Sequence, residues 1–247
     1  MTMSTTAVLR SEWIKIRSLR SVSGSLIAVF LVTMVVTVLT FATVGQTGAD
    51  DADAELVFGA FYALNFGQIA AISFGATAIS SEYLNGALRM SLAAVPRRTH
   101  FYTVKMSLIG GAALVVGLIT TFSSFLSGQL FMGEYAIGLG EPGALRAAFG
   151  GAIYLALMAL LAAGLTVLLR SAIAVLSLLI PFILIVSFVV GDIAGGAADY
   201  LPDRAGQLVL HQHPEGSLGP WTGLAVTAGW AAVMMLAAWW ALRRRDA

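Results

Sequence analysis

Few residues of this chain have the types and spacing that catalysis or metal binding requires. The stretch HQHP at 211–214 offers two histidines two residues apart, and DDADAE at 50–55 offers a run of carboxylates. The histidine pair has no third ligand of clear type, and the acidic run lacks the glycine and the spacing of a calcium loop. No nucleophile motif such as G-x-S-x-G occurs. We therefore interpret both segments as loops and expect no catalytic residue and no metal site.

Nucleotide binding is also unexpected from this sequence. A Walker A loop needs a Gly-Lys pair to hold nucleotide phosphates. The chain has two lysines, Lys15 and Lys105, and neither follows a glycine. The chain is thus not expected to be an enzyme or to hold a cofactor, and any ATP and Mg should be bound by another chain. Cysteine is absent, which excludes disulfides and thiol chemistry.

The composition indicates a membrane protein. Of 247 residues, 58% are hydrophobic and 11% charged, whereas soluble domains carry about 25% charged residues. Six runs without ionisable residues reach the length of about 20 residues that spans a bilayer. Backbone groups in lipid must bond within the segment, so the runs should be helices. We predict an all-α protein with one transmembrane domain, residues 1–247, and retained spans at about 22–44, 56–81, 106–132, 147–169, 171–191 and 218–242.

The placement of positive charge predicts the orientation. Twelve of the 14 Lys and Arg residues fall on one side, in residues 1–21, the loop 82–105, Arg170 and the tail 243–247. The other side has two Lys or Arg residues and ten acids. Cytoplasmic loops carry the excess of positive charge. Both termini and the 82–105 loop should therefore be cytoplasmic.

An amphipathic helix is predicted before the first span, at residues 7–20. At 100° per residue, five side chains fall within an arc of about 120°: Leu9, Glu12, Trp13, Ile16 and Leu19. This pattern is typical of a helix lying in the membrane interface, with Trp13 at headgroup depth and cations such as Lys15 and Arg17 toward phosphates. The helix either sets topology alone or also contacts a cytoplasmic partner.

The 82–105 loop combines charge with a short helical segment. Glu82 ends the second span, and NGALRMSLAAV at 85–95 is a plausible helix limited by Pro96, because the residue before proline disfavours the α conformation. Four cations make the loop basic: Arg89, Arg97, Arg98 and Lys105. They either lie against anionic lipid in the ordinary way or form a dock for another protein.

These segments together resemble the permease subunits of ATP-binding-cassette type-2 exporters, in the actinobacterial style. The resemblance rests on SEWIKIRSLRS before the first span, SSEYLNGALRMSLAAVPRRTHFYTVK after the second, and YLPDRAGQLVL at 200–210. The six-span layout agrees with it. Within the loop, the residues that match the family pattern are Glu82, Gly86, Arg89, Leu92, Pro96, Arg98 and Lys105.

The resemblance implies a division of labour between subunits. Residues 83–95 would be a coupling helix docked, with Arg97 nearby, on a separate ATPase, and the helix at 7–20 would be an elbow touching the same subunit through Trp13, Lys15 and Arg17. Residues 192–217 would hold short external re-entrant helices, as in type V exporters. The permease would work as a dimer, with a second copy or a related permease, in the bacterial cytoplasmic membrane. It would export an amphipathic or lipid-like substrate such as a drug, an antibiotic or a natural product.

Polar side chains within the spans are the candidates for a transport path. They are Asn65, Gln68 and Gln129, which could equally make hydrogen bonds between helices. No span holds an ionisable group, which argues against a proton-coupled carrier. A sodium-coupled or passive carrier and a non-transporting scaffold or sensor subunit stay open as alternatives. Small residues Gly67, Ala71 and Gly75 predict close helix packing, and Pro181 predicts a kink in the fifth span.

Overall fold

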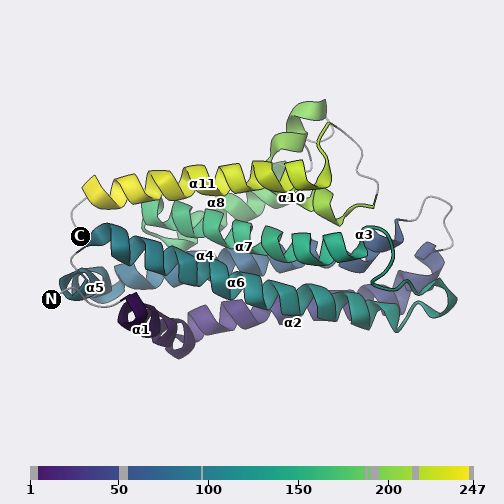
Figure 1. The fold of residues 1–247 in the computed structure, drawn as a ribbon, viewed down its shortest axis with the longest axis horizontal. Coiled ribbons are helices and arrows are strands. Elements are labelled where there is room, and N and C mark those ends of the chain that lie inside the picture. Colours follow the sequence, from purple (N-terminus) through teal and green to yellow (C-terminus); the bar gives the residue numbers. More distant parts are fainter. Residues whose placement is uncertain are drawn as a thin grey trace.

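The computed structural model describes residues 5–49, 55–95, 97–186, 189, 195–212 and 217–244. Every regular element in these ranges is helical. The long helices run side by side along the long axis of the molecule (Figure 1). Such a bundle follows from the uncharged runs, because a helix satisfies its own backbone groups where water is absent.

Five helical segments are long and apolar enough to cross a membrane. They correspond to five of the six predicted spans. They comprise α2 (Arg20–Ala49), α3 (Leu56–Phe61) with α4 (Leu64–Ser80) and η1 (Ser81–Gly86), α6 (Arg98–Gln129), α7 (Ala144–Leu169) and α11 (Pro220–Arg244). The largest difference in bounds is at α6, which begins eight residues before the predicted span. The last part of the predicted 82–105 loop is therefore helical.

The predicted span 171–191 is the one that the described residues do not confirm as a full-length span. Here α8 (Ala172–Pro181) is followed by a π-helical turn, η3 (Phe182–Val186). Proline lacks the N–H that would donate to the Ser177 carbonyl four residues earlier, so the regular ladder has a gap in the turn before Pro181. Residues 187, 188, 190 and 191 of the predicted span lie outside the described residues.

Helix α7 forms the centre of the bundle and packs against α4, α6 and α11. Close approach depends on small residues. A Cβ at Gly75 would overlap the Ala159 carbonyl of α7, and one at Gly67 would overlap the Thr33 hydroxyl of α2. The small residues predicted to allow close packing of the second span thus contact two helices, α2 at Gly67 and α7 at Gly75.

The two ends of the bundle carry different short elements. At one end lie α1 (Thr5–Ser18), which crosses the bundle, and α5 (Ala87–Ala94); at the other lie α3 and α10 (Pro202–Gln207) (Figure 1). The segment predicted at 192–217 is described from 195 to 212 and at 217, and includes η4 (Gly195–Tyr200) and η5 (Leu208–Leu210). Val209 and Leu210 of η5 are fully buried. These short helices close the far end of the bundle against α7 and α11.

Candidate functional site

Four charged side chains from three elements meet beside α5, and we call them the charge cluster: Glu12 and Lys15 of α1, Glu82 of η1 and Lys105 of α6. The Lys105 Nζ atom lies 2.6 Å from Glu12 Oε2 and 2.7 Å from Glu82 Oε1. The Lys15 Nζ atom lies 2.6 Å from Glu12 Oε1 and 2.9 Å from Glu82 Oε1. Each ammonium thus bridges both carboxylates, which closes a ring of four ion pairs.

Ser91 adds the short helix α5 to this ring. Its hydroxyl donates to Glu82 Oε2 at 2.9 Å and accepts from Lys15 Nζ at 2.9 Å. The chain reaches this position through Gly86, whose φ of 73° lies in the left-handed region that favours glycine. The charge cluster, together with Ser91, therefore connects four elements: α1, η1, α5 and α6.

Three members of the charge cluster are shielded from solvent, whereas the side chain of Lys15 is 33% exposed. Glu12, Glu82 and Lys105 are 2%, 4% and 2% exposed. An unpaired charge at such a place would be very costly, so burial of these groups requires that they be paired. The formal charges of the two lysines and the two glutamates sum to zero. Lys15 and Lys105 are also the only lysines of the sequence. Removing one member of a buried pair typically costs about 3–5 kcal/mol.

The protonation of Lys15 follows from its neighbours. Burial disfavours its charged form, but hydrogen bonds and negative charge from Glu12 and Glu82 outweigh burial and raise the pKa of the ammonium above its usual 10.5. Lys15 is consequently a cation throughout the physiological range.

The burial of α1 has a simple origin in its sequence. Val8, Glu12 and Ile16 recur every four residues and are the buried face of the helix. Of the predicted apolar arc, Glu12 and Ile16 face the bundle, whereas Trp13 and Leu19 are 46% and 38% exposed. Glu12 was not among the site residues predicted from sequence. The signal for it was an acid within the apolar arc, which only a buried cation can explain.

The other residues predicted in the 82–105 loop take different positions. Arg89 and Arg97 are exposed. Arg98 donates from Nη1 to the Leu242 carbonyl at 2.9 Å and so ties α6 to the end of α11. Leu92 packs against the hydrophobic core, and Pro96 lies outside the described residues. The structure thus separates an internal set, Glu82 with Lys105, from a set on the surface.

A groove of about 330 Å³ runs between α1 and α5, directly beside the charge cluster. Ala7 and Ser11 line it from α1, and Met90 and Ala94 line it from α5. Met90 is 67% exposed at its edge. Of the predicted elbow residues, Lys15 lines this groove, whereas Trp13 and Arg17 are exposed elsewhere on α1. An apolar side chain of another protein would fit between the two helices.

The structure does not bring together the three polar side chains predicted for a path. Asn65 donates to the Tyr62 carbonyl of the preceding turn at 3.0 Å. Gln68 accepts a hydrogen bond from the Tyr154 hydroxyl of α7. Gln129 accepts from the Ile137 backbone N–H at 2.8 Å. Gln68 therefore makes the hydrogen bond between helices that was its alternative role, and a role in transport stays a prediction.

Tyr154 is not among the residues predicted from the sequence, because a single tyrosine in an uncharged run does not indicate a buried hydrogen bond. It is fully buried, and its hydroxyl also accepts from Gln207 Nε2 of α10 at 3.4 Å. Gln68, Tyr154 and Gln207 thus form a chain of hydrogen bonds from α4 through α7 to α10. This chain helps to hold the short helices against the bundle.

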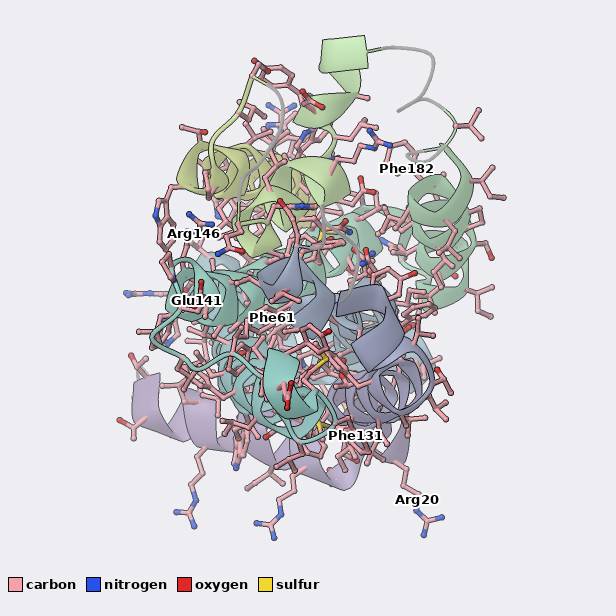
Figure 2. All side chains as sticks on the ribbon, turned by 90° about the vertical axis from the view of Figure 1, so that its right-hand side faces the viewer. Arg20, Phe61, Phe131, Glu141, Arg146 and Phe182 are labelled. Atoms are coloured by element: carbon pink, nitrogen blue, oxygen red, sulfur yellow. The ribbon has the colours of Figure 1, made fainter. Side chains whose placement is uncertain are left out.

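The far end of the bundle has its own charged contact. His211 Nδ1 lies 2.7 Å from Glu55 Oε2, and the imidazole stacks on Phe58 with ring centroids 4.0 Å apart. Arg146 donates from Nη2 to the His211 carbonyl at 2.5 Å. Viewed from this end, Arg146 lies beside the bundle axis and Phe61 closer to it (Figure 2). Residues 50–54 of the acidic run and His213 of the predicted histidine pair lie outside the described residues.

The bundle of long apolar helices defines a multi-pass membrane protein, and α1 and α5 lie together at one of its ends. A family model described as "ABC-2 family transporter protein" matches residues 8–190, well over half of the chain. The chain belongs to this family, which makes it a membrane permease component of an ABC transporter with an ABC ATPase as its partner. No curated protein shows significant similarity to it.

Proposed function

We propose that this chain is the transmembrane subunit of an ATP-driven exporter in the bacterial cytoplasmic membrane. It moves an amphipathic or lipid-like substrate, such as a drug, an antibiotic or a natural product, out of the cell as one half of a permease dimer. ATP and Mg are bound by the separate ATPase, which docks on the 82–105 loop. The substrate class rests on the many apolar and few charged side chains of the spans.

The observation that carries the proposal is the charge cluster. A force applied to α5 reaches α4 through Glu82, α6 through Lys105 and α1 through Lys15, over contacts of 2.6 to 2.9 Å. Because Glu12, Glu82 and Lys105 are buried, these three side chains cannot separate without exposing a charge to a poorly solvating interior. The docking element and the ends of two spans therefore move as one body.

Six crossings with both termini in the cytoplasm agree with the direction of the helices. Helix α7 ends near Tyr83, whose hydroxyl donates to the Val167 carbonyl, and α11 begins beside α10 at the opposite end (Figure 1). The segment that starts with α8 must return across the bundle to connect them. Six crossings place α1, α5 and the end of α11 on the side that the positive charges mark as cytoplasmic.

The test is co-expression with a partner ABC ATPase, which we expect a neighbouring gene to encode, followed by reconstitution in liposomes. We expect ATP-dependent export and lower coupled ATPase activity for Arg97→Glu, which reverses an exposed charge at the dock. The matched control is Arg244→Glu, which reverses an exposed charge at the end of α11 and should leave activity unchanged.

Two results would favour other functions. Substrate flux through liposomes that contain the permease without the ATPase would contradict the proposal and favour an ion-coupled or passive carrier. A stable complex with the ATPase that hydrolyses ATP but moves nothing would favour a scaffold or sensor subunit.

A further inference from the structure

A second groove, on the opposite flank of α1, faces the membrane. It has a volume of about 310 Å³ and an almost wholly apolar lining. We call it the elbow groove. Its residues are Leu9 and Trp13 of α1, Leu26 of α2, and Ser107, Leu108, Gly111, Ala112, Val115 and Val116 of α6.

The elbow groove has the length of one leaflet. Along α6 it extends from Ser107 to Val116, which at 1.5 Å per residue is about 14 Å. The hydrocarbon of one leaflet is about 15 Å thick, half of a core of about 30 Å. With α1 in the membrane interface, as its sequence predicts, the groove would start at the membrane surface and end near mid-bilayer. Val115 at the deep end is 57% exposed, so the groove is open sideways to lipid.

Gly111 is the residue that keeps the groove open. A Cβ placed there would meet no atom within 4 Å. A helix interior disfavours glycine by about 1 kcal/mol relative to alanine, and packing against a neighbouring helix does not explain this one. Gly117 on the same helix differs, because its Cβ would lie 3.1 Å from the Ala152 carbonyl oxygen.

The mouth of the elbow groove is cationic. Arg10, Trp13 and Arg17 fall within an arc of about 60° at 100° per residue, and all three are exposed. Glu12 is the one acid in the described α1, and the charge cluster neutralises it together with Lys15. Nitrogen-bearing side chains project from this side of the molecule away from the bundle, Arg20 among them (Figure 2). Indole and guanidinium groups at this depth suit a phosphate headgroup.

We propose that the elbow groove binds one anionic phospholipid. One acyl chain lies along α6 from Ser107 to Val116, and the phosphate lies between Arg10 and Arg17 beside Trp13. The elbow is then held on one flank by the charge cluster and on the other by a lipid. The site requires neither the ATPase nor transport, so it can be tested on the permease alone.

The experiment measures lipid retained by the purified permease with native mass spectrometry, after reconstitution in equal parts phosphatidylglycerol and phosphatidylcholine. The wild type should keep one phosphatidylglycerol per chain. Gly111→Leu fills the groove and should reduce retention at least tenfold. Gly229→Leu is the matched control, because this glycine of α11 also has nothing within 4 Å of its Cβ; it should retain lipid as the wild type does. Thermal unfolding of both variants checks that they fold.

A second pair of variants tests the headgroup. Arg10→Gln with Arg17→Gln should still bind lipid, but its preference for phosphatidylglycerol over phosphatidylcholine should fall about tenfold or more. Arg243→Gln with Arg244→Gln removes two cations from the end of α11 and should keep the preference.

Three results would overturn the proposal. Equal retention by Gly111→Leu and the wild type would mean ordinary annular lipid. Equal loss in Gly111→Leu and Gly229→Leu would mean that the groove is not the cause. Equal retention of the two lipids by the wild type would refute an anionic site.

Discussion

The two ends of the bundle each contain a charged contact, but the contacts differ in burial. In the charge cluster, the side chains of Glu12 and Lys105 are both 3% exposed. At the far end, the side chains of His211 and Glu55 are 31% and 28% exposed. Water can reach the contact between His211 and Glu55, whereas it cannot reach the pair formed by Glu12 and Lys105. The contact near the docking loop is therefore the costly one to break.

This difference suits the proposed mechanism. In that mechanism, the end that docks on the ATPase has to keep its contacts while it moves. The buried ion pairs of the charge cluster would keep α1, η1 and α6 together. In that mechanism, the end at which a substrate would leave has to open and close. The partly exposed contact between His211 and Glu55 permits such movement at little cost.

The largest expected effect is that of Lys105→Met. The substitution keeps the length of the side chain but leaves Glu12 and Glu82 to share Lys15. It should destabilise the folded permease by about 3–5 kcal/mol, measured as thermal or denaturant unfolding of the purified protein in detergent. Arg97→Met, at an exposed cation of the same loop, is the control and should change stability little.

A double variant sharpens this result. Glu12→Gln with Lys105→Met leaves one glutamate and one lysine, so the ring is balanced again and part of the stability should return. Absence of any recovery would mean that Lys105 acts through packing and not through charge.

The next effect is a loss of stability at alkaline pH. The pKa of Lys15 is raised in the folded state, so its stabilising contribution is complete below the unfolded value near 10.5 and is lost as pH rises through the folded pKa. Unfolding should be compared at pH 8 and pH 11 in the wild type and in Lys15→Arg. Arginine stays charged at pH 11, so this variant should lose less stability. Identical losses would show that Lys15 is not the titrating group.

Ser91→Ala should have a smaller effect. It removes two hydrogen bonds to charged groups, each worth about 1.5–3 kcal/mol when buried, but Ser91 is half-buried and alanine is the better helix former. We expect a net loss of about 1 kcal/mol, together with faster backbone amide exchange in α5 than in α6. Uniform exchange in both helices would argue that Ser91 does not anchor α5.

Glu55→Gln should have the smallest effect. The contact with His211 is partly exposed, and even a charged pair at such a place contributes about 0–1 kcal/mol. The stacking of His211 on Phe58 and the hydrogen bond from Arg146 are retained. A loss as large as that of Lys105→Met would contradict the contrast between the two ends.

The bundle was largely predictable because lipid imposes one rule on every span. Five uncharged runs correspond to long helices, and Gly67 and Gly75 pack as their spacing indicates. The fifth predicted span, 171–191, was harder because apolarity alone does not show where Pro181 interrupts the regular ladder.

The charge cluster could be predicted only in part. Glu82 and Lys105 were selected from a motif, and Lys15 from the elbow. Their meeting with Glu12 was not predictable, because Glu12 and Lys105 are separated by 93 positions and no local pattern joins them. The same holds for Gln68 and Tyr154, which lie 86 positions apart. Contacts between distant helices depend on the assembled bundle and are invisible to periodicity.

The pairing of the two lysines has a practical consequence for chemical labelling. Lys105 is shielded and Lys15 is engaged by three oxygen atoms, so neither side chain offers a free nucleophilic amine. Reagents that couple to amines, including common biotin esters and cross-linkers, should modify this subunit poorly wherever it meets its partner. A cross-linking map of the assembled transporter made with such reagents would contain few links to the lysines of this subunit, and carboxylate-directed or photoactivated chemistry is the better choice.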